Sequence, residues 1–161
     1  MPHYIIMGVS GCGKSTIGRA LAQRLDRPFI EGDDYHPPCN IDKMRAGKPL
    51  SNDDRKDWIT GLCAAINESP ASVTACSALN ETVRGWLRDS LKTAPVFIYL
   101  HGSEAVIRQR LSTRTDHYFD PVLLDSQFKA LHVPKDAVSI TIDNSPEAIV
   151  KDILRALDKA H

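Results

Sequence analysis

The chain has 161 residues, a length typical of one globular domain. Apolar residues make up 42% of it and charged residues 25%, which is ordinary for a soluble protein with a single core. Its 20 basic side chains balance 20 acidic ones, so the formal net charge is zero. A nucleic-acid partner or an anionic membrane surface would favour a basic excess, and we therefore expect neither.

Four cysteines, Cys12, Cys39, Cys63 and Cys76, form no CxxC pair and no zinc-ligand spacing. Reduced thiols of this kind are typical of a cytosolic protein. No apolar stretch approaches the roughly 18 residues that a membrane-spanning helix needs, and the N-terminus lacks the features of a signal peptide. We expect a cytoplasmic protein whose residues 1–161 form one domain.

Short apolar runs alternate with longer helical patterns, which predicts an α/β fold with a five-stranded parallel sheet and helices on both faces. The wholly apolar fourth strand is expected near the centre of the sheet. The predicted strands are residues 4–7, 28–30, 72–76, 96–100 and 138–142. The predicted helices are residues 15–25, 41–46, 81–91, 103–114 and 122–131. Two more helices are predicted from their caps: residues 52–54 cap a helix that runs through residue 66, and Ser145 caps the final helix.

A polar stretch rich in proline and aspartate follows the second predicted strand, over residues 35–55. Its many turn-forming residues indicate an excursion from the core rather than a part of the sheet. An excursion at this point can carry a substrate-binding lobe. We expect this lobe to span about residues 35–67, including the helix that follows.

Residues 8–15 read GVSGCGKS and match the phosphate-binding pattern GxxxxGK[ST], between an apolar strand and an amphipathic helix. Glycines let successive backbone N–H groups point into one concavity, and the helix adds its positive end. Lys14 is expected on the β and γ phosphates and the Ser15 hydroxyl on Mg²⁺. The predicted cofactors are ATP and Mg²⁺, and the predicted nucleotide-binding residues are Gly8, Val9, Ser10, Gly11, Cys12, Gly13, Lys14, Ser15 and Thr16.

Cys12 lies inside this loop, and two interpretations of it are open. Amides that stabilise a phosphate could also stabilise a thiolate and make the cysteine reactive. Alternatively, cysteine is simply a small side chain that fits the loop.

The loop alone does not separate a switch, a motor and a metabolite kinase. A GTPase switch would carry DxxG and NKxD motifs, and the sequence has neither. Two carboxylates, Glu31 and Asp33, instead follow the second strand one residue apart, which would place both on one face of that strand. At this end of the sheet one carboxylate could hold Mg²⁺ with Ser15, and the other could accept the proton of an attacking hydroxyl.

Three arginines, Arg108, Arg110 and Arg114, precede a polar break. Arg110 and Arg114 are four residues apart and would share a helix face. Arginines beside such a break suit a lid that closes over the phosphates and excludes water. We expect a lid over about residues 114–122.

Five segments occur in the order MGVSGCGKSTIG, FIEGDDYHPPCNIDKMRAGKPLSNDDRKDW, CSAL, VFIYLHG and RLSTRTDHYFDPVLLDSQF. They cover most of the chain, and in them the sequence resembles the small P-loop gluconokinase family. The resemblance implies a P-loop NTPase fold of the nucleoside-monophosphate-kinase type with a substrate lobe and a lid. It also implies ATP with Mg²⁺, phosphorylation of the 6-hydroxyl of D-gluconate, and a homodimer.

The resemblance implies roles for individual residues. Lys14, Asp33, Arg110 and Arg114 would be catalytic, with Asp33 as the base, and Ser15 and Glu31 would serve the metal. An arginine such as Arg55 would clamp the gluconate carboxylate, while polar side chains would meet its hydroxyls. The implied substrate-binding residues are Asp33, His36, Asn40, Lys43, Arg55, Arg84, His117 and Gln127.

The chain departs from the family pattern at Asn80, where the family usually carries a lysine after CSAL, and at Val83 and Gly85. A cation lost near the ligand crevice would weaken the binding of an anionic substrate. Several readings stay open: gluconate held more weakly by Arg55 and Arg84, a related sugar acid or polyol, or a regulatory nucleotide-binding protein. A shikimate-like or nucleoside-phosphate kinase is a further rival.

Overall fold

A computed structural model describes residues 2–112 and 123–160. Its centre is a five-stranded, wholly parallel sheet in the order β2-β3-β1-β4-β5. The strands are β1 Tyr4–Met7, β2 Phe29–Glu31, β3 Val73–Ala75, β4 Val96–His101 and β5 Val138–Thr141. The predicted α/β fold with its five parallel strands is therefore confirmed, although β1 and not β4 is the middle strand.

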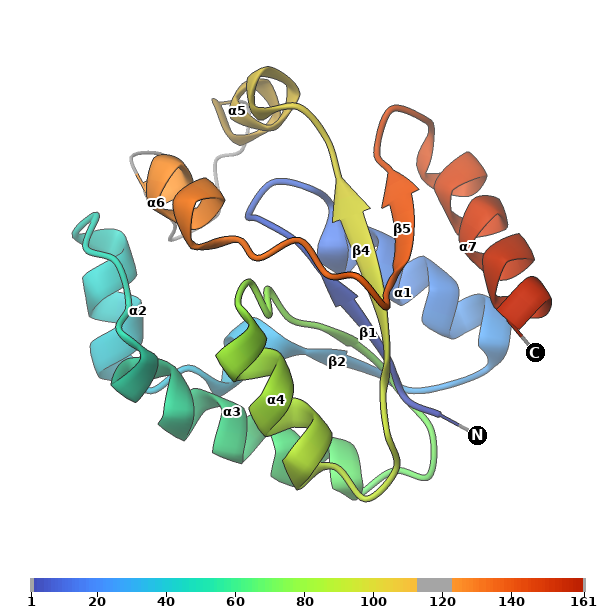
Figure 1. Ribbon diagram of the computed structural model, residues 1–161, viewed down its shortest axis with the longest axis horizontal. Coiled ribbons are helices and arrows are strands. Elements are labelled where there is room, and N and C mark those ends of the chain that lie inside the picture. The colour runs from blue at the N-terminus through green and yellow to red at the C-terminus, as the bar shows by residue number, and fades with distance from the viewer. Residues whose placement is uncertain (1, 113–122, 161) are drawn as a thin grey trace.

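The helices are α1 Lys14–Leu25, α2 Pro38–Arg45, α3 Asn52–Asn67, α4 Glu81–Ser90, α5 Glu104–Ser112, α6 Leu123–Ala130 and α7 Pro146–Ala160, with a short 3-10 helix η1 Gly32–Tyr35. In Figure 1, α1 and α7 lie on one side of the sheet and α3 and α4 on the other. The helices α2, α5 and α6 lie toward the carboxyl ends of the strands. Among the described residues, no helix has the length and apolar character needed to cross a bilayer.

The middle strand β1 is buried on both faces, and its residues divide between two cores. Tyr4 and Ile6 pack with apolar residues of α1 and α7, whereas Ile5 and Met7 pack with α3 and α4. This division follows from the alternation of side chains along a strand. A strand buried on both sides is rigid, so the loop that leaves its carboxyl end starts from a fixed point.

Two of the predicted boundaries were wrong in the excursion after β2. The helix α2 begins at Pro38 rather than at residue 41, because proline is well tolerated in a first helical turn. The cap of α3 is Ser51, whose Oγ accepts from the Asp54 N–H at 3.1 Å while the Asp54 carboxylate accepts from the Ser51 N–H. Residues 52–54 are therefore the first turn of α3 and not its cap.

Serine caps begin two further helices, as predicted for Ser145. Ser145 Oγ accepts from the Ala148 N–H at 3.2 Å, and Ser103 Oγ accepts from the Val106 N–H at 3.3 Å. The predicted lid, residues 114–122, lies outside the described residues together with the expected end of α5.

Candidate active site

The loop between β1 and α1 can be built only with glycine at its first position. A Cβ atom on Gly8, where φ is +146°, would lie 2.6 Å from the Leu100 carbonyl oxygen and 2.8 Å from Cys12 Sγ. Gly13 also has a positive φ, 94°, and immediately precedes α1. The Lys14 ammonium donates to the carbonyl oxygens of Gly8 at 3.0 Å and Val9 at 3.1 Å, which holds its charge over the loop.

Cys12 is buried beneath this loop, with 1% of its surface exposed, and its side chain packs in the core against α1 and β4. The geometry favours the interpretation that cysteine is a small side chain that fits.

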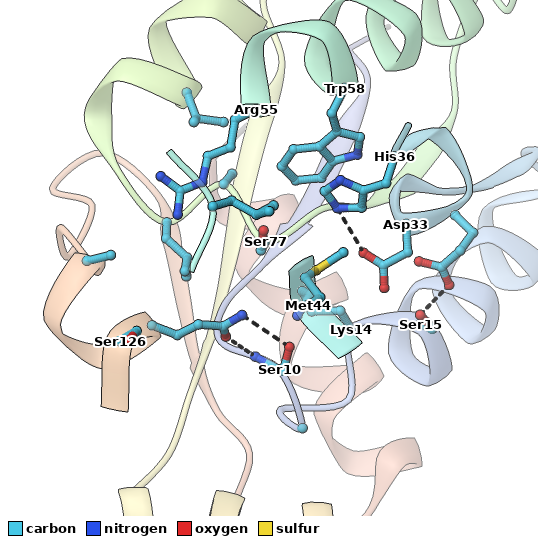
Figure 2. A pocket seen from close by; sticks show the side chains of 18 of the residues that line it. Ser10, Lys14, Ser15, Asp33, His36, Met44, Arg55, Trp58, Ser77 and Ser126 are labelled. Atoms are coloured by element: carbon cyan, nitrogen blue, oxygen red, sulfur yellow. Dashed lines mark hydrogen bonds and ion pairs between the residues drawn. The ribbon is translucent and has the colours of Figure 1, made fainter. Parts of the chain in front are cut away.

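One cavity of about 760 Å³ joins the loop to the ends of the neighbouring strands and to the excursion (Figure 2). Its position at the carboxyl ends of parallel strands is the usual place for a ligand in a fold of this kind. The loop lines it with Ser10, Gly11, Gly13, Lys14, Ser15 and Thr16. The segments after β2 and β3 line it with Glu31, Asp33, Asp34, His36, Ser77, Ala78 and Leu79, the excursion with Met44, Lys48, Pro49, Leu50, Arg55 and Trp58, and α5 and α6 with Arg110, Leu111, Ser126, Gln127 and Ala130.

Ser15 and Glu31, the predicted metal pair, meet at the floor of this cavity. The Ser15 hydroxyl donates a hydrogen bond to the Glu31 carboxylate (Figure 2), and the Arg19 guanidinium lies 4.0 Å from the same carboxylate oxygen. Among the described residues, no three His, Cys, Asp or Glu side chains gather into a metal cluster. Two oxygen donors beside a phosphate-binding loop nevertheless fit Mg²⁺, which usually keeps several waters and phosphate oxygens as ligands.

Glu31 and Asp33 both line the cavity, but the predicted reason was wrong. The strand β2 ends at Glu31, and Asp33 belongs to the 3-10 helix η1, so strand alternation does not relate the two side chains. Gly32 permits this turn, because a Cβ there would lie 2.3 Å from the Ala75 carbonyl oxygen. Trp58 Nε1 donates to the Gly32 carbonyl oxygen at 2.7 Å and so anchors the turn to α3.

His36 lies deep in the same cavity and is 8% exposed. Its ring stacks on that of Trp58, with centroids 4.1 Å apart and planes 18° apart. Burial, and after it the nearby charge of Arg55, lower the pKa of His36 to about 4. The ring is therefore uncharged at neutral pH, and its Nε2 lies 3.9 Å from Asp33 Oδ1.

Two residues predicted to bind substrate, Asn40 and Lys43, do not line the cavity. Asn40 is fully buried, and its Nδ2 donates to the Asp54 carbonyl oxygen at 2.8 Å and lies 3.2 Å from His36 Nδ1. Lys43 Nζ lies 2.7 Å from Asp54 Oδ2, and this hydrogen bond, with that from the Ser51 backbone, lowers the pKa of Asp54 to about 2. Both side chains join α2 to the start of α3, so they shape the lobe from behind the cavity wall.

Arg84, also predicted to bind substrate, does not line the cavity. It is fully buried and donates to the carbonyl oxygens of Ala78 at 2.6 Å and His132 at 2.7 Å, and to the Glu81 carboxylate. Ala78 itself has a positive φ of 43°. Arg84 therefore holds the turn between β3 and α4 against the segment that follows α6.

Asn80, where the family usually carries a lysine, is the N-cap of α4. Its Oδ1 accepts from the Val83 N–H at 2.9 Å, and its Nδ2 lies 3.3 Å from Asn52 Oδ1. The side chain is not among those that line the cavity. A lysine at this position could not accept the hydrogen bond of the helix N-terminus.

Arg110 lines the cavity as predicted for a lid arginine, and its Nη2 donates to the Ile142 carbonyl oxygen at 3.1 Å. Its expected companions Arg114 and His117 lie outside the described residues. Gln127 also lines the cavity, but it contacts the phosphate loop: its Oε1 accepts from the Ser10 N–H at 2.7 Å (Figure 2). Arg108 is paired with Glu104 and Asp125 on the surface.

Sequence reasoning named neither Lys48 nor Trp58 as a site residue. Lys48 lines the cavity and directly follows Gly47, whose φ of 74° turns the chain. Nothing in the spacing around Lys48 distinguishes it from a solvated lysine. Trp58 fits the helical pattern of α3, and only the three-dimensional contacts reveal that it also meets His36 and Gly32.

The parallel sheet, the phosphate loop and the cavity that faces acidic and basic side chains together define a P-loop phosphotransferase. The family model described as shikimate kinase matches residues 10–158. A "Probable gluconokinase" of Dictyostelium discoideum is 38% identical over 95% of this chain and 84% of its own length. The "Thermoresistant gluconokinase" of Escherichia coli K12 is 37% identical over 97% of this chain and 93% of its own.

Among solved structures, a gluconokinase from Sinorhizobium meliloti 1021 superposes with a TM-score of 0.90 and 38% identity, covering 99% of this chain and 93% of that one. The chain belongs to the gluconokinase family, within the wider group of kinases that the shikimate kinase model describes.

Proposed function

We propose that the protein transfers the γ-phosphate of ATP to the 6-hydroxyl of D-gluconate. The observation that carries the proposal is that Lys14 of the phosphate loop and the Asp33 carboxylate line the same cavity. Transfer requires a polyphosphate and a hydroxyl acceptor in line with each other, and this cavity offers a place for each. The choice of gluconate as the acceptor rests on the relatives, which are named as gluconokinases.

In this proposal the chain's own residues do three things. The loop amides and the Lys14 ammonium hold the polyphosphate, and with Arg110 they offset the charge that develops on the transferred group. Ser15 and Glu31 would hold Mg²⁺, which would supply positive charge against the phosphates. Asp33 orients the acceptor hydroxyl and accepts its proton as the new oxygen–phosphorus bond forms.

The far wall of the cavity supports a carboxylate-bearing acceptor. Arg55 and Lys48 both line the cavity, and the guanidinium of Arg55 can bind a carboxylate with two parallel hydrogen bonds. Burial lowers the pKa of Arg55 from its usual value, but an arginine stays charged at neutral pH.

An acceptor panel tests the proposal. Full-length protein with Mg·ATP is assayed for coupled ADP release with gluconate, related sugar acids, uncharged polyols, shikimate and nucleoside monophosphates. We expect gluconate to give the highest kcat/KM, and uncharged polyols of the same length to lose affinity because Arg55 and Lys48 then meet no carboxylate. ADP release that no acceptor accelerates would contradict the proposal and favour a regulatory protein.

The proposal includes a homodimer, as the family resemblance implies, and a cytoplasmic location, as the sequence features suggest. Sedimentation of the full chain at several concentrations tests the oligomeric state. A single monomeric species at all concentrations would contradict the homodimer but would not affect the proposed phosphoryl transfer.

A further inference from the structure

A buried hydrogen-bond chain fixes the orientation of the Asn40 side chain. Asn40 Nδ2 lies 2.8 Å from the Asp54 carbonyl oxygen. A carbonyl oxygen only accepts, so the amide atom that faces it must be the NH₂ group, and the assignment of nitrogen and oxygen in this side chain follows. The same NH₂ group lies 3.2 Å from His36 Nδ1. A hydrogen-bond donor therefore faces this ring nitrogen.

The donor at Asn40 decides which nitrogen of His36 carries the hydrogen. Because Nδ1 faces an N–H group, it accepts, and the hydrogen of the uncharged ring is on Nε2. Burial and the charge of Arg55 keep the ring uncharged at neutral pH. Stacking on Trp58 at 4.1 Å fixes the ring plane, so the direction of the Nε2–H bond is fixed as well.

This Nε2–H bond faces Asp33 across the cavity (Figure 2). The 3.9 Å between His36 Nε2 and Asp33 Oδ1 is too long for a hydrogen bond between them. It is the separation expected if one oxygen atom lies about 2.8 Å from each, with the two bonds meeting at roughly a right angle. A hydroxyl has one hydrogen for Asp33, one lone pair for His36, and a second lone pair left over.

We propose that His36 and Asp33 together hold the acceptor hydroxyl, and that Asn40 is a positioning residue that keeps the hydrogen of His36 on Nε2. The inference rests on the proposed phosphoryl transfer and adds the donor that orients the nucleophile. The hydroxyl gives its proton to Asp33 while its remaining lone pair forms the bond to phosphorus and the bond to the departing ADP breaks. His36 keeps its own proton throughout.

The arrangement selects a hydroxyl by its chemistry. An ether oxygen has no hydrogen for Asp33, and an ammonium group has no lone pair for the His36 N–H. An ammonium group would leave the buried His36 N–H without its acceptor, and an ether would give Asp33 no proton to accept, so both are discriminated against. The class of acceptor is therefore an alcohol that reaches the base of the cavity.

Two substitutions of His36 distinguish the effect of losing the N–H donor from the effect of losing the aromatic ring. In His36→Gln the terminal amide reaches the place of Nε2, whereas in His36→Asn it reaches only the place of Nδ1. Both remove the stacking on Trp58 equally. We expect His36→Gln to keep kcat for gluconate within about tenfold of the wild type and His36→Asn to lose about 100-fold, with KM for ATP unchanged in both. Equal losses of kcat in the two variants would overturn the inference.

The tautomer can be measured directly in the wild-type protein. Nitrogen-15 NMR of the full chain labelled at histidine is expected to report His36 as an uncharged ring with its hydrogen on Nε2 at neutral pH. In Asn40→Asp a carboxylate replaces the donor, so the hydrogen is expected on Nδ1 and kcat is expected to fall as in His36→Asn. If that variant fails to fold, the wild-type spectrum still decides.

The outcomes separate this inference from the proposed function. An Nδ1–H ring in a wild-type enzyme that phosphorylates gluconate overturns the inference and leaves the function standing. An Nε2–H ring in a protein that phosphorylates no hydroxyl acceptor overturns the proposed function and, with it, the role of His36.

Discussion

Asp33 and Asp34 are neighbouring carboxylates of one short helix, and both line the cavity, yet only one of them faces His36. The position of a carboxylate relative to its neighbours, rather than its presence in a cavity, decides what it can do in catalysis. The pair therefore offers a matched comparison at the scale of a single residue.

Removing the base without changing its shape should impair the chemical step. Asp33→Asn is expected to lower kcat by about 10²–10⁴-fold with little effect on KM for ATP, because the amide cannot take up the proton of the substrate hydroxyl. The matched control is Asp34→Asn, which should stay close to the wild type. Initial rates of ADP release measure both. A larger loss in Asp34→Asn than in Asp33→Asn would reassign the base.

The buried, uncharged His36 should make stability depend on pH. Its pKa is about 4 in the folded protein and 6.5 in a model peptide, so the unfolded chain binds more protons between these values. Stability is therefore complete above pH 6.5 and falls as the pH drops toward 4, by about 3 kcal/mol in all.

Urea unfolding at a series of pH values measures this slope. The control is His36→Gln, which has no titrating ring and should lack this part of the slope. If both proteins lost stability equally between pH 6.5 and 4, His36 would not be the group responsible.

At the scale of an element, the start of α4 depends on Asn80, which departs from the family pattern, and on Arg84, which the family resemblance assigns to substrate. Asn80 supplies the cap and Arg84 holds the preceding turn. Both are tied to main-chain groups, so substitution should change stability before it changes binding.

The cap can be tested by exchange of one side chain. Asn80→Ala and Asn80→Lys are each expected to lower the free energy of unfolding by about 1 kcal/mol, whereas Asn80→Asp, which can still accept the Val83 N–H, should be near neutral. Thermal unfolding of the three variants measures the differences. Destabilisation of Asn80→Asp as large as that of Asn80→Ala would argue against the cap.

Arg84 is expected to act on stability alone. Arg84→Met removes the donor from the buried Ala78 carbonyl oxygen and from the half-buried hydrogen bond to the His132 carbonyl oxygen, and it should cost about 3 kcal/mol of unfolding free energy, with KM for gluconate unchanged in the folded fraction. Denaturant titration and steady-state kinetics are compared on the same preparation. A stable variant with a strongly raised KM would restore the substrate role that the family resemblance implied.

Across the whole molecule, sequence reasoning succeeded where function is local in the chain and failed where it depends on which way a side chain turns. The phosphate loop is one continuous motif between a strand and a helix, so residues 8–15 and the fold around them could be predicted. Asn40 and Arg84 were predicted to bind substrate, but both donate hydrogen bonds to main-chain carbonyl oxygens, which the spacing of residues in the sequence does not reveal. Lys48 lines the cavity and carries no local pattern.

The central claim concerns the whole cavity: one end holds the polyphosphate of ATP and the other presents a hydroxyl to it from beside Asp33. A crystal structure of the full chain with a non-hydrolysable ATP analogue, Mg²⁺ and gluconate measures this most directly. The account predicts the analogue's phosphates within the amides of residues 8–15, the 6-hydroxyl between Asp33 and the γ-phosphate, and the carboxylate at Arg55. Phosphates bound away from that loop, or gluconate with its carboxylate at Asp33's end of the cavity, would contradict it.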